Sequence, residues 1–227
     1  MKFATLFLSS LFLINAFAIE TKRELKIEAP LHTGFFGVSV GAMNDYEFLN
    51  DISGTKSDGR FDRSYEVFGQ SYVYTSTNKY AKGAVSMGLG LLYLSEDIYD
   101  ANIEDKSFDI YNLSGDLAFH YIPNHVFRFF IGLKSNYAMV PNKEFTAKVN
   151  GVEVKEIIEY TGGISFGFQT GFDIVVGPSF MQLRYQSFNM PLEVSAKTLS
   201  NNVETSSSKV KGTYKISQVV VSVGVNF

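Results

Sequence analysis

The sequence of 227 residues contains no cysteine. This absence excludes disulfide bonds, thiolate metal sites, cysteine nucleophiles and a lipoprotein anchor, which needs a cysteine directly after its signal. The chain beyond residue 18 also has no run of about 18 apolar residues, so we expect no transmembrane helix. The formal net charge of −3 argues against nucleic acid as a partner.

The first eighteen residues differ from the rest of the chain. Lys2 supplies a positive start, 3–17 is mainly apolar, and Ala16-Phe17-Ala18 has the small-x-small form of a cleavage site. Since the apolar run is shorter than the about 20 residues that span a membrane, 1–18 is predicted to be a cleaved signal peptide of an exported protein. A retained anchor helix is the alternative. Residues 19–32 are expected to form a polar lead-in before a folded domain over 33–227.

From Thr33 on, the chain alternates between apolar and small or polar residues, which predicts β-strands. In the first stretch, Phe36, Val38 and Val40 form the apolar parity. The frame of 64–76 is the least regular, and we assign Tyr65, Val67 and Val73 to its apolar parity because the other frame would place Glu66 and Gln70 there. The eight predicted strands are 33–44, 64–76, 83–94, 107–121, 126–140, 162–175, 179–189 and 214–227.

The connections between these strands alternate in length. They are short at 77–82, 122–125 and 176–178, and long at 45–63, 95–106, 141–161 and 190–213. Short turns on one side and long loops on the other are typical of transmembrane barrels, with the long loops outside the cell. We therefore predict an all-β protein: an eight-stranded antiparallel up-and-down transmembrane β-barrel with short periplasmic turns, long extracellular loops and its apolar parity facing lipid.

A secreted β-sandwich or a lipocalin-like barrel is the alternative, with the apolar parity buried in a core. Two charged residues interrupt the apolar parity, Asp109 and Lys215, each twelve residues from the periplasmic end of its strand. Because about 9–11 residues of a strand cross a bilayer, both are expected above the lipid. A basic side chain facing the middle of the bilayer would cost about 2–4 kcal/mol, and the predicted lipid face carries none.

The chain resembles the small eight-stranded outer-membrane barrels: the transmembrane domain of outer-membrane protein A, the OmpX-like proteins and the opacity-type surface proteins. The resemblance lies in the signal peptide, the eight alternating segments, the loop asymmetry and the closing Val221, Val223, Val225 and Phe227. It implies the outer membrane of a Gram-negative bacterium, contact with lipid and lipopolysaccharide, and barrel-assembly machinery that reads the closing residues as an assembly signal. The aromatic residue usual two positions before the end is Val225 here, and no peptidoglycan-binding domain follows. A resemblance at the level of the fold indicates almost nothing about activity.

The inward parity carries charges that we expect to form an ionic cluster in the lumen. An enclosed charge is tolerated only when it is paired or hydrated, and Asp173 and Arg184 are expected to pair directly across the turn at 176–178. Inward Phe130, Phe180, Phe188 and Tyr214 facing inward glycines predict large-small filling of a narrow barrel. A packed plug is the main interpretation, and a narrow or gated passive pore is the alternative. The expected lumen cluster is Glu66, Asp116, His120, Arg128, Lys134, Asp173 and Arg184.

An enzymatic role is the third hypothesis considered. His120 shares the inward face with Ser114 and Asp116, which are the residue types of a nucleophile triad. The lipid A deacylase barrels use a His-x-Ser pattern facing lipid, which His120-Tyr121-Ile122 does not match. A lone inward histidine is more often satisfied by a polar neighbour. We therefore predict no catalytic residues, no enzyme and no cofactor.

The outer loops suggest interaction. Residues 145–157 alternate around Asn150-Gly151, a strong hairpin signal, and 194–199 with 203–210 look similar, so both loops are expected to continue as strands beyond the membrane. A protruding sheet edge can pair with a strand of an extracellular protein or other surface ligand, although it can also stay solvated and unpaired. The acidic stretch 96–105 lacks calcium-loop spacing, so we expect no metal site. The prediction is a monomeric outer-membrane protein with a structural or surface-interaction role.

Overall fold

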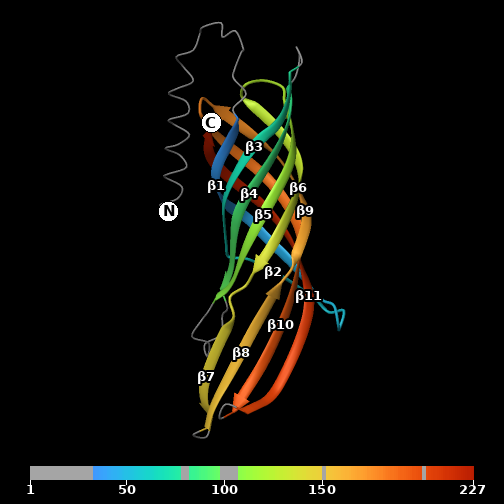
Figure 1. The fold of residues 1–227 in the computed structure, drawn as a ribbon, viewed down its shortest axis with the longest axis vertical. Coiled ribbons are helices and arrows are strands. Elements are labelled where there is room, and N and C mark those ends of the chain that lie inside the picture. The colour runs from blue at the N-terminus through green and yellow to red at the C-terminus, as the bar shows by residue number, and fades with distance from the viewer. Residues whose placement is uncertain (1–32, 78–81, 98–106, 150–151, 201–202) are drawn as a thin grey trace. The chain divides into compact units, whose positions relative to one another are not determined.

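The computed structural model describes residues 33–77, 82–97, 107–149, 152–200 and 203–227. The signal peptide and lead-in predicted over 1–32 lie outside these ranges. No helix that could cross a membrane occurs in the described ranges. The described chain forms the strands β1 (Gly34–Asn50), β2 (Lys56–Arg60), β3 (Arg63–Thr77), β4 (Lys82–Asp97), β5 (Ser107–Ile122), β6 (Phe127–Met139), β7 (Lys143–Val149), β8 (Val152–Gly162), β9 (Ile164–Val176), β10 (Ser179–Ser200) and β11 (Val203–Asn226) (Figure 1).

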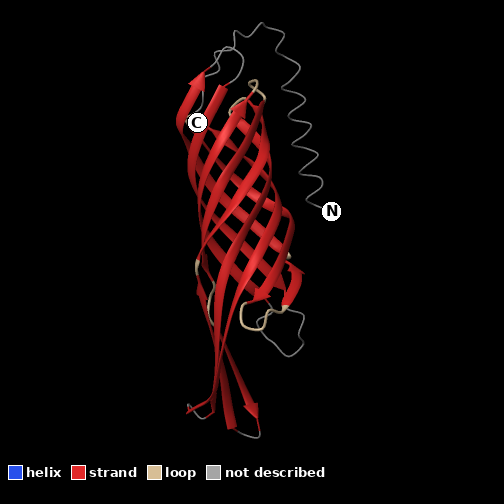
Figure 2. Cartoon of the chain, turned by 90° about the vertical axis from the view of Figure 1, so that its right-hand side faces the viewer, coloured by secondary structure: helices blue, strands red, loops and turns tan. Residues whose placement is uncertain are grey.

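Eight of the described strands close into a ring through antiparallel pairs. The order is β1-β3-β4-β5-β6-β9-β10-β11, and β11 returns to β1. Val223 shows the closure, because it lies opposite Val38 of β1 on one side and Met181 of β10 on the other. The predicted fold class is confirmed: the chain is an eight-stranded antiparallel up-and-down barrel, whose crossing strands appear in Figure 2.

The period of two decides which side chains face the lumen. On β1, Phe36, Val38 and Val40 are exposed on the outside, while Ser39 between them is buried inside. The uncertain frame of 64–76 is also confirmed, since Tyr65 and Val67 are exposed. Successive side chains of a strand point to opposite faces of the sheet. Once one side chain is assigned to the outside, the facing of every other side chain in that strand follows, up to the next bulge.

Two bulges shift this parity in the barrel wall, and a third register shift lies farther along β10, between Thr198 and Leu199. The register of β1 with β11 shifts between Gly41 and Met43, and Ala42 and Met43 are both exposed before Asn44 turns into the lumen. The register of β3 with β4 shifts between Tyr72 and Tyr74. A bulge inserts one extra residue into a strand and is not visible in a simple alternating pattern.

The strands are longer than the sequence suggested. The predicted loop 45–63 is largely wrong, because β1 continues to Asn50 and β2 pairs with it over Lys56–Arg60. The predicted hairpin around 150–151 is confirmed as β7 and β8, and the second one as the outer parts of β10 and β11. The alternation in 45–50 continues that of the strand before it, shifted by the bulge.

Four strands continue beyond the rest of the barrel wall. We call this part the outer extension: β7, β8, residues 194–200 of β10 and residues 203–211 of β11. Its sheet order is β7-β8-β10-β11, and it lies at the opposite end of the barrel from the C-terminus (Figure 1). The short turns lie at the end with the C-terminus, which we call the turn end.

Candidate functional site

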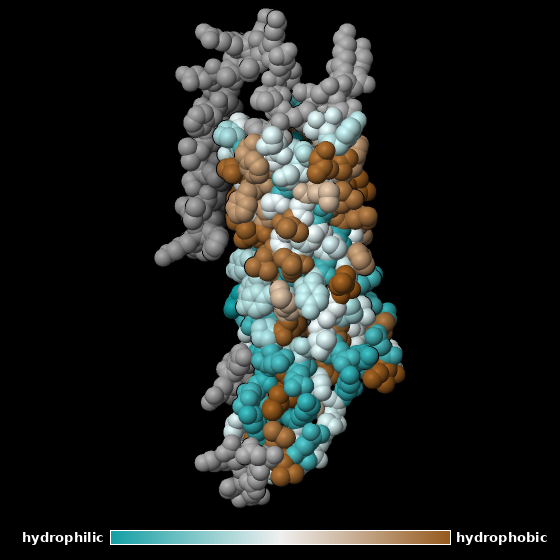
Figure 3. Space-filling model, in the orientation of Figure 1, coloured by the Kyte–Doolittle hydropathy of each residue, from teal (hydrophilic) through white to brown (hydrophobic). Residues whose placement is uncertain are grey.

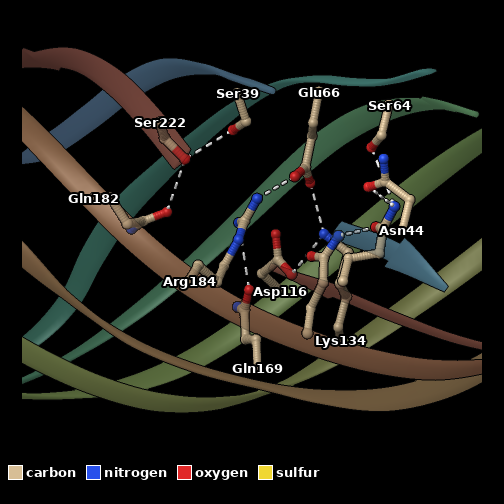
Figure 4. Close-up of polar contacts among 12 residues, drawn as sticks. Ser39, Asn44, Ser64, Glu66, Asp116, Lys134, Gln169, Gln182, Arg184 and Ser222 are labelled. Carbon is tan, nitrogen blue, oxygen red and sulfur yellow. Dashed lines mark hydrogen bonds and ion pairs between the residues drawn. The ribbon is translucent and has the colours of Figure 1, made fainter. Parts of the chain in front are cut away.

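The middle of the lumen holds an ion network contributed by four strands. Glu66 of β3 lies 2.6 Å through Oε1 from Lys134 Nζ of β6, and its Oε2 contacts the Arg184 guanidinium of β10. Asp116 of β5 lies directly opposite Lys134, at 3.7 Å from its ammonium. All four side chains are buried, and Figure 4 shows them converging. The lumen therefore pairs charges that far-apart segments of the sequence supply.

A second ion pair lies nearer the turn end. Arg128 Nε lies 3.1 Å from Asp173 Oδ2, and its guanidinium donates to the Tyr72 hydroxyl at 2.8 Å. Gln182 Nε2 donates to the other oxygen of Asp173 at 2.9 Å. Three acids and three permanent cations thus balance within the lumen, as burial of charge requires.

The predicted pairing of Asp173 with Arg184 is wrong. The register places Gln182, not Arg184, opposite Asp173 across β9 and β10, while Arg184 lies opposite Gly171. On its other side Asp173 lies opposite Arg128 of β6. Residues directly opposite on one face have the closest Cβ atoms, so Asp173 pairs with Arg128 and leaves Arg184 to Glu66.

His120 lies outside the ion network. Its Nε2 is 2.7 Å from Ser86 Oγ, and Ser86 Oγ donates to Gln70 Oε1 at 2.8 Å. The donor in the His120–Ser86 contact depends on the histidine tautomer, and a Ser86 hydroxyl that donates to Gln70 is satisfied without the histidine acting as a base. His120 and Ser86 are both buried. Ser114 and Asp116 do not join His120, and the geometry gives no triad.

Two buried apolar clusters lie inside the barrel, one toward each end of the lumen. At the turn end, Phe35, Phe68 and Phe180 form a plug, and their rings contact one another edge to face. At the other end a larger plug separates the ion network from the outer extension. The members of this outer plug are Phe61, Leu92, Leu94, Ile110, Ala138, Val140, Phe188, Met190, Leu192 and Ile216.

Inward glycines make room for these rings, as predicted. A Cβ on Gly37 would lie 2.8 Å from Phe68 Cζ and 3.1 Å from Phe180 Cζ. Phe130, Phe180 and Phe188 are buried. The outer plug was missed by sequence reasoning, although its signal was present: the inward parity turns from polar to apolar at Leu92, Ile110 and Met190.

Part of the lumen wall is polar but lacks protein partners. The side-chain oxygen and nitrogen of Asn112 and Asn136 and the hydroxyls of Ser114 and Ser165 are buried without a hydrogen-bond partner. Ser114 lies opposite Asn136, which lies opposite Ser165, so these groups form a row across β5, β6 and β9. Buried polar groups generally need a partner, including water.

An apolar belt surrounds the barrel outside the ion network. On the face that Figure 3 shows, brown side chains gather on the part of the barrel toward the turn end, and the outer extension is mainly teal with some brown. Contiguous exposed apolar surface of this size is rare on soluble monomers. The belt includes Phe36, Val38, Val40, Val67, Met87, Leu89, Leu91, Leu113, Leu117, Phe119, Phe129, Ile131, Leu133, Phe166, Phe168, Leu183, Val223 and Val225, all exposed.

Tyrosines border the belt on the side of the extension. Tyr65, Tyr93 and Tyr111 lie opposite one another on β3, β4 and β5, with Tyr65 and Tyr93 stacked. The Tyr93 hydroxyl donates to Asp109 at 2.8 Å, so this carboxylate sits at the polar border of the belt. Tyrosines at such a border are typical of membrane interfaces, where one end of the ring is apolar and the other wet.

The remaining sequence-based candidates fall on β11 and on the acidic stretch. Val221, Val223, Val225 and Phe227 lie at the turn end, with Val223, Val225 and Phe227 exposed. The acidic stretch is described only at Glu96, which accepts a hydrogen bond from Tyr46, and Asp97, which pairs with Arg63. Within the described ranges, histidines and acids form no group of three suited to a metal ion.

Searches against family models and curated proteins gave no match. Among solved structures, the chain is similar to neisserial surface protein A (TM-score 0.42, 11% identity, 85% of this chain and 97% of that one). It is also similar to Ail, the attachment invasion locus protein of Yersinia pestis (0.41, 11%, 86% and 99%). A third is the outer membrane protease OmpT from Escherichia coli (0.26, 10%, 87% and 98%).

At these identities and TM-scores the similarities assign no activity, and the fold rests on the chain's own strand pairing. That pairing closes eight antiparallel strands into a ring with connections between consecutive ring strands. The lumen is filled by paired charges and aromatic rings, as expected for a barrel of this size. The chain therefore has the architecture of a small eight-stranded antiparallel β-barrel with an apolar outer belt.

Proposed function

We propose that this chain is an outer-membrane protein of a Gram-negative bacterium that acts at the cell surface through its outer extension. The filled lumen is the observation that carries the proposal. Two apolar plugs lie on either side of a charge-balanced network, which supports a lumen that does not conduct solutes. The surface beyond the lipid is then the part available for function.

The apolar belt supports the location. Lipid and lipopolysaccharide would cover the exposed leucines, valines and phenylalanines, while the tyrosine border would lie at the outer headgroups. The closing Val221, Val223, Val225 and Phe227 would serve barrel-assembly machinery, and the protein would be a monomer. Fractionation tests the location: the processed chain should stay with outer membranes and require detergent for release. A chain that remains folded and dissolved without detergent would contradict it.

Deletion of the outer extension tests the surface role. Removing 145–157 or 194–210 should abolish attachment of the bacteria to cells or matrix while the barrel still assembles. Retained barrel assembly can be checked by the resistance of the barrel to SDS without heating. Unchanged attachment by bacteria carrying an assembled, shortened barrel would contradict a role for the extension.

A gated pore is the second candidate, favoured by the row of unpartnered polar groups at Asn112, Ser114, Asn136 and Ser165. Polar groups lining a lumen can hydrate it, and apolar constrictions can act as gates. Under our proposal, purified protein in a planar bilayer shows no defined conductance. Discrete channels that change with Arg128→Ala or Asp173→Ala would instead favour the pore.

A lipid-modifying enzyme is the least supported alternative. His120 and Ser86 lie inside the barrel wall, away from lipid. This alternative requires a change in lipid A chemistry that disappears in the His120→Ala variant.

A further inference from the structure

The outer extension has two chemically different faces. Leu192 belongs to the outer plug, and Val194, two residues further along β10, points to the same side. Val194 lies opposite Tyr160 of β8 and Val210 of β11. We call this side the inner face. Its described members are mainly apolar or hydroxyl-bearing, and Lys143 and Glu156 are the charged exceptions. The apolar and hydroxyl-bearing members include Phe145, Val154, Ile158, Tyr160, Val194, Ala196, Thr198, Ser206, Ser208 and Val210.

The opposite, outer face carries the ion pairs of the extension. Lys197 lies 3.1 Å from Glu159, and Lys155 lies 2.7 Å from Glu144. Alternation of charge and apolarity across one sheet is the pattern of a sheet with one side in water. The inner face is continuous with the lumen-facing side chains of the outer plug. Because it is the less charged side of the extension, it is the side suited to contact with a partner.

The outer part of β11 is an open sheet edge. Pairing of β1 with β11 ends where Asn50 meets Gly212, and the Asp51 amide then donates to the Lys211 carbonyl. Beyond this point, 203–210 pairs with β10 on one side. Among the described strands none pairs with its other side. Such an edge presents backbone N–H and C=O groups to an incoming strand.

The other edge of the extension is less open. The Lys143 ammonium at the start of β7 contacts the Ser107 carbonyl at the start of β5. The chain thus already reaches the base of this edge. The edge of β11 is therefore the better candidate for an added strand.

Charge at the β11 edge indicates the chemistry of that strand. One carboxylate, Glu193, is shared by two ammonium groups: Lys209 contacts one oxygen, and Lys211 lies 3.1 Å from the other. Both lysines are more than half exposed, at 59% and 60%. Around Glu193 the outer side of this edge therefore carries one excess positive charge, and Glu204 adds a negative charge near the far end of the edge. Ser208 and Val210 on the inner side are uncharged.

We propose that the β11 edge binds an extended polypeptide in which acidic and apolar residues alternate. Its backbone would pair with 203–210, its acidic side chains would lie opposite Lys209 and Lys211, and its apolar side chains would extend the inner face beside Val210. Cross-strand pairs of opposite charge stabilise such an arrangement. This inference rests on the proposed surface role of the extension and names the class of partner.

The test uses the full processed chain in lipid nanodiscs and fluorescein-labelled peptides of eight residues. One peptide alternates Glu and Val, and a second alternates Lys and Val. The third and fourth are the Glu–Val peptide N-methylated at every Glu or at every Val, which gives the two N-methylation frames. Fluorescence anisotropy should show saturable binding of the Glu–Val peptide. Binding should be at least about tenfold weaker for one of the two N-methylation frames, because that frame removes the edge hydrogen bonds.

Charge reversal provides the matched comparison. Lys209→Glu with Lys211→Glu should abolish preference for the Glu–Val peptide and create preference for the Lys–Val peptide. Lys155→Glu with Lys197→Glu, on the same face but away from this edge, should leave the preference unchanged. Equal effects of the two double variants, or indifference to N-methylation in both frames, would overturn the inference.

The peptide result is separable from the proposed function. If deletion of 194–210 abolishes attachment but no peptide binds, the surface role stands and the strand-pairing inference fails. Attachment that survives deletion, together with peptide binding at the β11 edge, would refute the surface role alone.

Discussion

Replacement of Glu66 by glutamine tests the physical basis of the closed lumen. Glu66 is 2% exposed and meets Lys134 at 2.6 Å and Arg184 through its other oxygen. Glu66→Gln leaves two lumen acids facing three cations, with Arg184 losing its charged partner. Removing one member of a buried ion pair typically costs about 3–5 kcal/mol, and we expect a loss of that size in the free energy of unfolding.

Glu47→Gln is the matched control. Glu47 meets Lys56 at 2.8 Å, nearly the distance of the Glu66–Lys134 pair, but the two side chains are 38% and 62% exposed. Exposed pairs contribute about 0–1 kcal/mol because water screens them. The two substitutions thus change the same residue type in a similar pair and differ in burial.

Urea unfolding of the protein in lipid vesicles, followed by circular dichroism, gives both free energies. A double variant, Glu66→Gln with Arg184→Met, should recover part of the loss, because it removes the guanidinium that has lost its charged partner and adds an apolar group. The reasoning is refuted if Glu66→Gln costs less than about 1 kcal/mol or no more than Glu47→Gln.

Three further outcomes follow from the same structure. Gly37→Ala should destabilise the barrel by about 1–3 kcal/mol in urea unfolding, since its Cβ would crowd Phe68. Gly69→Ala should change stability far less, because its Cβ would lie 3.7 Å from Phe36 Cδ2, an ordinary contact distance. Leu89→Arg on the lipid face should cost about 2–4 kcal/mol in vesicles, and a loss under 1 kcal/mol would contradict the position of the belt. Hydrogen bonds from Lys209 and then Lys211 lower the pKa of Glu193. The stability that these bonds give the β10–β11 hairpin is therefore fully present above the unfolded-state pKa of Glu193. It is lost as the pH falls through the lower pKa of the folded state. Carboxyl-detected NMR titration should find the Glu193 pKa below 4.5 and returning toward it in Lys209→Ala, and an unshifted pKa would refute the pairing.

The alternating residues alone determined the fold and the parity of most strands. Side chains of a strand alternate strictly, so Val38 on one face dictates Ser39 on the other. The lumen residues Glu66, Asp116, Lys134 and Arg184 could be placed inside for the same reason. The hairpin at 150–151 followed from local turn chemistry, which depends on neighbouring residues only.

Tertiary structure alone decided which lumen charges pair. The choice of Arg128 over Arg184 for Asp173 depends on the register of β6, β9 and β10, and a register is set by the closing of the whole ring. The bulge at Gly41/Met43, the outer plug and the open edge of β11 depend likewise on strands far apart in sequence. Periodicity fixes the direction of each side chain, but only pairing between distant segments fixes its neighbours.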